Sequence, residues 1–257
     1  MPARRLGTPT KPGPTLLKLG GALLTDKARE AAFRPTRAAR LFEEVAQAKR
    51  PVALVHGAGS FGHPQVARLR DELAGHGPRA DAAARTVLES LAELRIKVLA
   101  AAKKAGLDAQ AVPLTAPPTA ASRDGQDVVR ILREGRIPIL HGTLVRHGAG
   151  WRVLGGDEQM ALLARFLKPE RAVWATDVAG VYDRDPRERG AVLLREVGAG
   201  GASTGGRGRD VTGRMAGKLA WAAQAAAVCP TWIVGGQAPG VVRRALRGKP
   251  EGTRVLP

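Results

Sequence analysis

The sequence contains little cysteine and few aromatic residues. Its 257 residues include one cysteine, Cys229, four phenylalanines, four tryptophans and one tyrosine. A single cysteine can form neither an internal disulfide nor a multi-cysteine zinc site, so Cys229 is interpreted as a packed thiol. With so few aromatic rings, the stacking platforms that bind single-stranded nucleic acid would be sparse. No apolar run approaches the roughly 18–20 residues that cross a bilayer, so no membrane partner is expected.

Motifs of several enzyme classes are absent too. The chain has no G-x-x-x-x-G-K-[ST] P-loop and neither the H-R-D nor the D-F-G motif of protein kinases. Clusters of cysteine and histidine with the spacing of metal ligands are also missing, and no direct protein ligand to a metal is predicted. These absences exclude the P-loop and protein-kinase classes.

Positive charge is in large excess. The chain has 41 lysines and arginines against 23 aspartates and glutamates, which gives a formal net charge of +18. Such an excess favours anionic partners, either phosphates or nucleic acid. The basic residues are scattered, without a block of five or six together, so nucleic acid is not expected as the main partner. A non-catalytic protein that binds anions or nucleic acid stays open as an alternative of a different class.

Residues 1–14 form a basic, proline-rich N-terminal extension that lacks an apolar segment. This pattern differs from that of a secretory signal, and we expect a cytoplasmic protein. The hydrophobic fraction of the chain is 44%, which is typical of a globular protein with a buried core.

Predicted strands and helices alternate along the rest of the chain. Short apolar runs predict strands, and a three- or four-residue spacing of apolar side chains predicts helices. The longest helical pattern has Val87, Leu91, Leu94 and Val98 on one face and ends before Gly106. Strands are expected at 15–19, 51–55, 137–140, 171–175 and 231–234, and helices at 36–49, 79–104, 157–167 and 213–228. This alternation predicts an α/β fold with a mostly parallel central sheet.

The first candidate site, KLGGA at residues 18–22, follows the first predicted strand. Paired glycines let backbone N–H groups approach an anion closely, because no Cβ stands in the way. Lys18 adds a point charge for phosphate, and Lys27 follows nine residues later. A tight turn with incidental surface lysines explains the same residues, so this segment alone does not decide.

The second candidate site, HGAGSFGHP at residues 56–64, follows the next strand. Its glycines have the G-x-G-x-x-G spacing of a dinucleotide site, which needs a further strand about 20 residues on that ends in an acidic residue. No apolar strand follows before about residue 109, so the dinucleotide interpretation is rejected. We interpret His63 as a phosphate ligand at the end of a glycine loop, and His56 as a structural histidine at the strand end.

Three further segments offer contacts to anions. The segment GGDE at residues 155–158 opens a predicted helix, and helix N-termini bind anions. Asp157 could cap that helix, or it could organise lysines and a metal. Asp177 stands in a turn after a strand, and Lys218 lies about one turn into the helix that follows a glycine-rich loop at 198–208. Each segment by itself is equally compatible with a plain turn or a capped helix.

Taken in this order, the segments resemble those of the amino-acid kinase superfamily, and within it most of all those of the isopentenyl phosphate kinases. The matching segments are KLGGALLTDK (18–27), HGAGSFGHP (56–64), HGTLV (141–145), GGDE (155–158), ATDVAGVYD (175–183), DVTGRMAGK (210–218) and EGTRV (251–255). Together they span the chain after residue 14. The similarity to isopentenyl phosphate kinases depends mainly on SFGH, which ends in His63.

The resemblance implies an open αβα sandwich formed by a single domain of residues 15–257. Residues from about 15 to 168 would hold the phosphoryl acceptor, and residues from about 169 to 257 would hold ATP with Mg²⁺. The implied reaction is the ATP-dependent phosphorylation of isopentenyl phosphate to isopentenyl diphosphate, a step of isoprenoid biosynthesis. A homodimer is expected because the family commonly pairs.

The resemblance also implies roles for the residues that match the family's motifs. Lys18, Lys27 and His63 would be catalytic, and Asp157 would organise the site. The residues expected at ATP are Lys18, Gly20, Gly21, Ala22, Gly59, Asp177, Arg214 and Lys218. The residues expected at the acceptor phosphate are Ala58, His63 and Gly156.

Two residues depart from the family pattern. Ala58 stands where the family usually has a glycine, and alanine still offers its N–H if the backbone there needs no positive φ. Arg214 replaces another usual glycine, and it would either crowd the nucleotide or add a phosphate contact. A fosfomycin kinase-like enzyme, or another member of the superfamily with a phosphate or carboxylate acceptor, stays open as an alternative.

Overall fold

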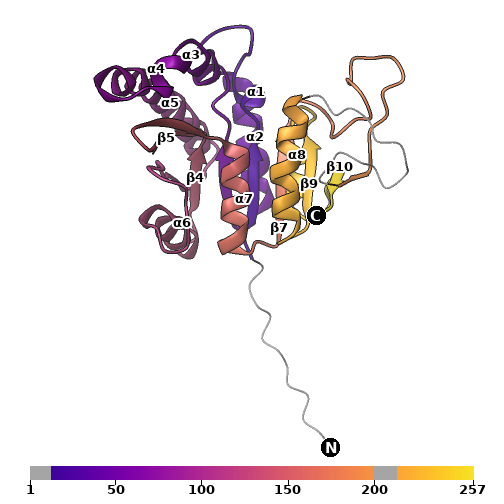
Figure 1. The fold of residues 1–257 in the computed structure, drawn as a ribbon. Helices are drawn as coiled ribbons and strands as arrows, with labels where there is room; N and C mark the ends of the chain where they lie inside the picture. The colour runs from indigo at the N-terminus through magenta and orange to yellow at the C-terminus, as the bar shows by residue number, and fades with distance from the viewer. Residues whose placement is uncertain (1–12, 199–212) are drawn as a thin grey trace, which may run out of the picture.

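An eight-stranded sheet forms the centre of the fold (Figure 1). The computed structural model describes residues 13–198 and 213–257, except for the side chains of residues 213 and 214. The strands lie in the order β3-β4-β2-β1-β7-β9-β10-β8. Their bounds are β1 (Thr15–Leu19), β2 (Val52–His56), β3 (Ala109–Ala111), β4 (Ile137–His141), β7 (Arg171–Thr176), β8 (Glu196–Val197), β9 (Thr231–Gly235) and β10 (Gly252–Val255).

β1 lies in the middle of the sheet, and its sequence explains this place. All five of its residues are buried and three of them are leucines, which is typical of a strand covered on both faces. β1 pairs in parallel with β2 and β7, and β3, β4 and β9 continue the parallel arrangement. The carboxyl ends of these strands therefore lie along one edge of the sheet. β10, which contains most of the EGTRV segment, runs antiparallel to β9.

Helices and one hairpin complete the described part of the chain. The helices are α1 (Gly21–Leu24), α2 (Pro35–Ala48), α3 (His63–Arg68), α4 (Arg70–Ala74), α5 (Gly77–Lys104), α6 (Arg123–Arg133), α7 (Gly156–Leu167), α8 (Gly213–Ala226) and α9 (Val241–Leu246), with a short 3₁₀ turn at Gly59–Phe61. The hairpin joins β5 (Thr143–His147) to β6 (Gly150–Leu154). Within the described ranges, no helix is both long and apolar enough to span a bilayer.

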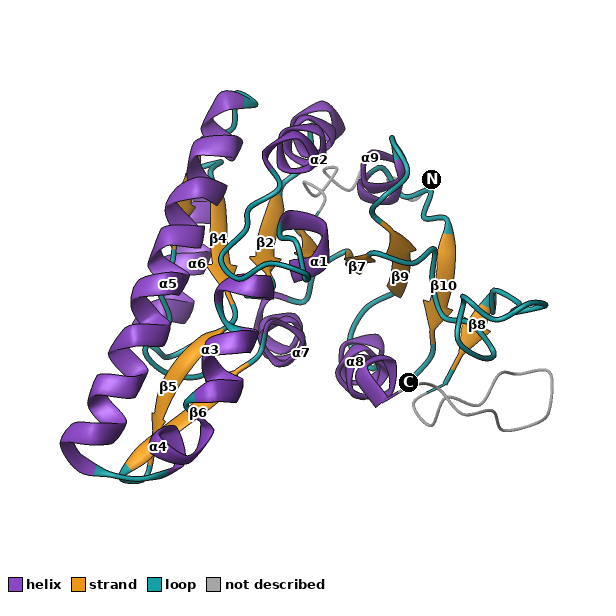
Figure 2. Ribbon diagram, turned by 90° about the horizontal axis from the view of Figure 1, so that it is seen from above, coloured by secondary structure: helices purple, strands orange, loops and turns teal. Residues whose placement is uncertain are grey.

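Helices cover both faces of the sheet (Figure 2). α7 and α8 lie on one face, where they pack on Leu16 and Trp174. α2 and α9 lie on the opposite face, where Leu17 and Leu54 belong to a second core. Leu16 and Leu17 enter different cores because side chains alternate between the two faces of a strand. The predicted α/β sandwich with a mostly parallel sheet is confirmed.

The long helix α5 serves two cores. Its carboxyl half places Leu94 and Val98 in the core that α2 covers. Its amino half packs against α4 and the hairpin, in what we call the hairpin-side apolar cluster. The buried members of this cluster are Leu73, Ala83, Ala84, Val87, Leu91 and Leu144. The predicted helix end is also confirmed, because α5 ends at Lys104 and Gly106, two residues later, has a φ of +76°. The chain between β2 and β3 is helical and contains no strand, which agrees with the rejection of a dinucleotide site.

Candidate active site

The carboxyl edge of the sheet carries most of the segments that the sequence singled out. Gly20 follows β1, Gly57 follows β2, Gly142 follows β4, and Asp177 follows β7. Ligands of open α/β sheets bind outside the carboxyl ends of the strands, at the point where the strand order reverses. β1 has β2, the next strand in the chain, on one side and β7, a much later strand, on the other, so the strand order reverses at β1. This edge beside β1 is therefore the place for a ligand.

Three charged side chains meet there, on the face covered by α7 and α8. Lys18 Nζ lies 2.7 Å from Asp157 Oδ1, and Lys218 Nζ lies 3.1 Å from the same oxygen. Trp174 Nε1 also donates to Asp157 Oδ1, at 2.7 Å. Asp157 does not cap α7, since Gly155 is the N-cap and no side-chain cap bond is formed. The cap interpretation is wrong, and the carboxylate joins two lysines from distant parts of the chain.

The charges of this trio shape its pKa values. Burial, and next the neighbouring Lys218 ammonium, lower the pKa of Lys18 to about 8 against the opposing effect of Asp157. Burial alone would raise the pKa of Asp157, but the ammonium groups of Lys18 and Lys218 outweigh it and lower that pKa to about 2. Asp157 is therefore ionised at neutral pH and keeps two like charges adjacent. Adjacent ammonium groups with a single counter-charge favour the binding of a polyanion.

A second ion pair spans the site. Lys27 Nζ lies 2.7 Å from Asp177 Oδ2, and about half of the Lys27 side chain is exposed. Partial burial opposes ionisation of Asp177, but the hydrogen bond and charge of Lys27 lower its pKa below the ordinary value. Gln237 Nε2 donates to Asp177 O at 2.5 Å. The loop after α1 is thereby joined to the ends of β7 and β9.

The glycine turns after β1 and β2 pack directly on each other. A Cβ at Gly57 would lie 2.6 Å from Gly21 N, which leaves no room for a side chain. Gly59 has a φ of +53°, in the left-handed region that glycine adopts readily. Thr25 Oγ1 donates to Gly21 O at 2.9 Å and accepts from Ser60 N at 3.0 Å. The two turns therefore form one unit around Thr25.

Backbone donors gather between the ends of β2 and β4. A Cβ at Gly142 would lie 3.4 Å from Gly156 N and 3.8 Å from Ala58 N. Gly156 begins α7, so its N–H is one of those that a helix leaves without an internal acceptor. In the described ranges, no backbone or side-chain acceptor pairs with Ala58 N–H. A Cβ at Gly156 would lie 3.1 Å from Lys18 Cε, so these donors adjoin the charged trio.

The structure resolves one of the two departures from the family pattern. Ala58 has a φ of −67° and a ψ of −29°, which every L-residue adopts, so alanine offers its N–H without strain. The side chain of Arg214 lies outside the described residues, as do residues 210–212 of the same motif and most of the glycine-rich loop. Its two alternatives therefore stay open.

The remaining predicted residues lie along the same edge. His63 is the first residue of α3, with an exposed side chain, and it follows Ala58 closely in the chain. Gly20 donates its N–H to Ala175 O at 2.9 Å, which commits this donor to the sheet. Gly21 and Ala22 begin α1 directly after it.

The hairpin-side apolar cluster borders the backbone donors. Ala58 packs against it from the β2 turn, and Leu144 belongs to it two residues after Gly142. Val87 and Leu91 of α5 supply part of its buried surface. A ligand bound at the donors could therefore place an apolar group against α5.

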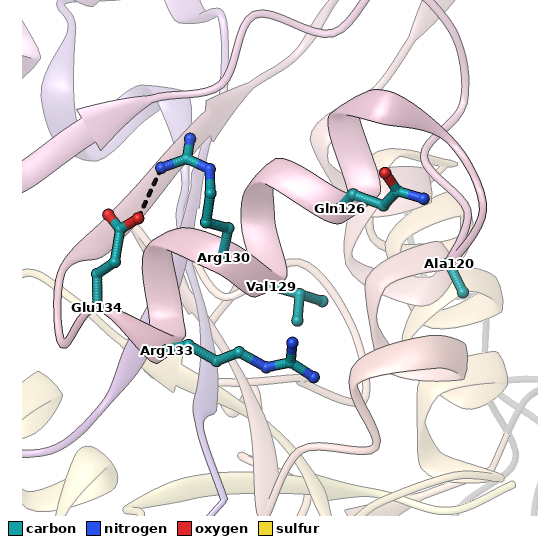
Figure 3. Close-up of a pocket in the computed structure, with 6 residues that line it drawn as sticks. All are labelled: Ala120, Gln126, Val129, Arg130, Arg133 and Glu134. Carbon is teal, nitrogen blue, oxygen red and sulfur yellow. Dashed lines mark hydrogen bonds and ion pairs between the residues drawn. The ribbon is translucent and has the colours of Figure 1, made fainter.

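A surface pocket lies elsewhere, on α6 (Figure 3). It is lined by Ala120, Gln126, Val129, Arg130, Arg133 and Glu134. α6 leads into the start of β4, so its carboxyl end lies near the amino edge of the sheet, opposite the site. Arg130 and Glu134 form an ion pair of 2.8 Å within the pocket. None of the predicted site residues contributes to it.

Sequence reasoning missed several residues of the site. Trp174 was placed only in a strand, although its indole N–H binds Asp157. Gln159 was placed only in a helix, but its Nε2 donates to His141 O at 2.7 Å and to Leu154 O at 3.1 Å. A polar residue two places after Asp157 in an apolar helix was the available signal for Gln159. No signal in the sequence distinguishes Trp174 from an ordinary core residue.

Comparison with known proteins shows the family of this chain. The model of the amino acid kinase family matches residues 14–235. The chain belongs to the amino acid kinase family.

Within that family, the chain is similar to isopentenyl phosphate kinases, as its motifs predicted. It is 31% identical over 185 residues to the enzyme of Thermoplasma acidophilum, which covers 71% of this chain and 75% of the relative. It is 30% identical over 263 residues to that of Methanothermobacter thermautotrophicus, which covers 93% and 98%. The solved product complex of the T. acidophilum enzyme matches with a TM-score of 0.79 at 26% identity, over 94% of this chain and 99% of that one.

Proposed function

We propose that this chain is an ATP-dependent kinase that phosphorylates isopentenyl phosphate to isopentenyl diphosphate. The observation that carries the proposal is that Lys18 and Lys218 meet on Asp157 beside the backbone donors of Ala58 and Gly156. The lysines suit the phosphates of ATP, and the donors suit a second phosphate next to them. The similarity to isopentenyl phosphate kinases supports the identity of the acceptor.

The acceptor of this reaction brings its own nucleophile. A phosphate monoester has a second pKa near roughly 6, so its oxygen is ionised at neutral pH and needs no protein base. That oxygen forms a bond to the γ-phosphorus of ATP while the bond from this phosphorus to the bridging oxygen of ADP breaks. Such transfers pass through a loose transition state, so catalysis depends mostly on position and charge.

The charged residues would hold the two anions together. Lys18 and Lys218 would bind the ATP phosphates, and Asp157 would keep the two ammonium groups in place. Lys27 would reach the phosphates by exchanging Asp177 for an oxygen of ATP. His63 would contact the acceptor phosphate from the start of α3. In this scheme no residue needs to remove a proton from the acceptor.

Mg²⁺ fits the site as an ion that is bound together with ATP. Mg²⁺ keeps several waters and is commonly bound through substrate phosphates with one or two carboxylates. Asp157 and Asp177 supply ionised carboxylates beside the lysines, and they would contact the ion through its water shell. When bound, the ion would neutralise charge on the β- and γ-phosphates.

The apolar part of the acceptor would lie against the hairpin-side apolar cluster. Ala58 connects that cluster to the backbone donors, so a phosphate bound there would direct a short hydrocarbon chain toward Val87 and Leu91 of α5. An apolar surface beside a few convergent polar groups is the usual form of a small-molecule site. A small polar acceptor such as fosfomycin or glutamate would leave this surface unused.

We infer the same division of the domain that the family resemblance implies. Ala58, Gly156 and the hairpin-side apolar cluster belong to residues 15–168, which would hold the acceptor. Asp177 and Lys218 belong to residues 169–257, which would hold the nucleotide. A cytoplasmic location and a homodimer stay predictions.

A screen of acceptors tests the proposed function. The protein is incubated with ATP, Mg²⁺ and isopentenyl phosphate, fosfomycin or glutamate in turn, and products are followed by phosphorus NMR. We expect diphosphate signals with isopentenyl phosphate, loss of turnover in Lys218→Met, and full turnover in Lys104→Met, which removes an exposed lysine at the end of α5. Turnover of another acceptor alone would assign a related kinase. Salt-dependent DNA binding without ATP turnover would favour the non-catalytic alternative.

A further inference from the structure

Two buried histidines stand at the carboxyl edge on the face opposite Lys18. His56 ends β2 and His141 ends β4, and the two are register partners in the parallel sheet. Leu54 and Ile139, two residues earlier in each strand, belong to the core that α2 and α5 cover, so both imidazoles point to that face. Their ring centroids lie 5.4 Å apart. Neither ring can reach a phosphate beside Lys18 directly.

Both rings have the same protonation state, fixed by their hydrogen bonds. His56 Nδ1 lies 3.2 Å from Gly57 O, and His141 Nδ1 lies 3.0 Å from Gly142 O. A carbonyl oxygen can only accept, so Nδ1 carries the proton in each ring. Both Nε2 atoms are buried, and within the described residues they have no hydrogen-bond partner. Burial, and for His56 also the neighbouring His141, lower the pKa of each ring, so both are neutral at neutral pH.

The hydrogen bond of His56 orients a peptide group of the candidate phosphate site. Gly57 O belongs to the same planar peptide as Ala58 N–H, and in a trans peptide the two point in opposite directions. When the imidazole holds the carbonyl on the α5 face, the Ala58 N–H must point away from that face. Gly57 packs against Gly21, but within the described residues the imidazole is the hydrogen-bond donor to Gly57 O, so loss of this bond would loosen the orientation of Ala58 N–H.

His141 makes the equivalent hydrogen bond on the neighbouring strand. Its ring holds Gly142 O and so fixes the backbone of Gly142, which lies beside the nitrogens of Ala58 and Gly156. The other backbone groups at this point are already bound. Gly142 N donates to His56 O at 3.1 Å, and Gln159 Nε2 donates to His141 O. Within this network, the two imidazole bonds are what fix the peptides that follow each strand.

We propose that His56 and His141 are paired positioning residues: the Nδ1–H of His56 aims the Ala58 N–H at the acceptor phosphate, and the Nδ1–H of His141 holds the Gly142 backbone that lies beside the nitrogens of Ala58 and Gly156. The proposal concerns the phosphate-binding half of the proposed function, and it rests on that function. In this proposal the two strand-end histidines orient backbone groups of the phosphate site, in addition to packing in the core.

Asparagine and leucine variants separate positioning from packing. The side-chain amide of asparagine occupies the place of Nδ1 and can donate to the same carbonyl, although it is smaller than the ring. Leucine fills the apolar surroundings but donates nothing. We expect His56→Leu to raise the KM for the acceptor by about five- to tenfold, the scale of one neutral hydrogen bond, with the KM for ATP nearly unchanged. His56→Asn and His141→Asn should stay within about threefold of the wild-type acceptor KM.

The reverse order, with leucine close to wild type and asparagine impaired, would show that the rings only pack, and would overturn the proposal. Equal losses for acceptor and ATP in both variants would overturn it too. Where a variant fails to fold, nitrogen-15 NMR of the wild-type imidazoles decides instead. Both rings should be neutral with the proton on Nδ1, and a proton on Nε2 in either ring would refute the proposal.

A titration with inorganic phosphate keeps this test separate from the proposed function. The amide signal of Ala58 should shift with phosphate in the wild type and in His56→Asn, and shift much less in His56→Leu. This result is expected even if isopentenyl phosphate is not the acceptor. Equal shifts in all three proteins would contradict the positioning role.

Discussion

Replacement of Asp157 by asparagine tests the charged trio most sharply. The variant keeps a similar shape and can still accept from Trp174 Nε1, but it removes the only charge that lies between Lys18 and Lys218 in the contacts described. Breaking a buried ion pair by removing one partner costs about 3–5 kcal/mol, because the remaining charge stays buried without compensation. About a quarter of the Asp157 side chain is exposed, so solvent screens part of the loss. We therefore expect Asp157→Asn to lower the free energy of unfolding by about 3 kcal/mol.

The decisive comparison adds Lys18→Met to the same protein. In the wild type, Lys18→Met leaves Asp157 paired with Lys218, so we expect a change in the free energy of unfolding of less than about 1 kcal/mol. In Asp157→Asn, the same change removes the stranded charge and should restore about 2 kcal/mol. Urea unfolding of the four proteins, without nucleotide, measures both effects. If the double variant were as unstable as the sum of the single variants, the trio would not act as a coupled unit.

Three further predictions concern catalysis and pH. Lys27→Ala should lower kcat by about 10²–10³, the scale for one transition-state donor. Asp177→Asn breaks the same ion pair but keeps the ammonium, so it should lower kcat by less than about tenfold. A changed KM for Lys27→Ala with kcat preserved would exclude a transition-state role for Lys27. The pKa of Lys18 near 8 predicts that kcat/KM for ATP falls as pH rises through this value, and a profile that stays flat to well above it would contradict the assignment. His56 has a pKa of about 3 in the folded protein and about 6.5 when unfolded, so the unfolded chain binds the extra proton between these values. The contribution of neutral His56 to the free energy of unfolding is therefore fully present above about pH 6.5 and falls by about 2 kcal/mol by pH 5, and His141 adds to the loss. Urea unfolding at several pH values should show a weaker pH dependence for His56→Leu than for the wild type.

The parts of the fold that repeat a simple pattern could be predicted from the sequence. β1 and α5 have long, regular apolar patterns with clear glycine ends, and both were placed within two residues of their bounds. α6 and the β5–β6 hairpin were not anticipated, and β3 was indicated only as an apolar strand near residue 109. β3 is only three residues long and half-buried, and the hairpin is partly exposed, so neither shows a continuous apolar run. Such elements form because neighbours supply the packing that their own sequence does not indicate.

The candidate site, too, could be predicted from the sequence only in part. Glycines and lysines next to strand ends were identified because their chemistry is visible in the sequence. Their mutual arrangement was not visible, since Lys18 and Lys218 are brought together by sheet order and by Asp157. The strand-end histidines show most clearly what the sequence alone cannot predict. His56 was interpreted as structural, and only the register of β2 with β4 shows that His141 repeats its hydrogen bond one strand away.

The most direct test of the account is a crystal structure with a non-hydrolysable ATP analogue and isopentenyl phosphate bound together. We predict the γ-phosphate at the ammonium groups of Lys18 and Lys218, and the acceptor phosphate within about 3.2 Å of the N–H groups of Ala58 and Gly156. The hydrocarbon chain should lie beside Ala58, along the partly exposed members of the hairpin-side apolar cluster. An acceptor phosphate bound elsewhere, or lysines that stay on Asp157 without touching the nucleotide, would contradict the account.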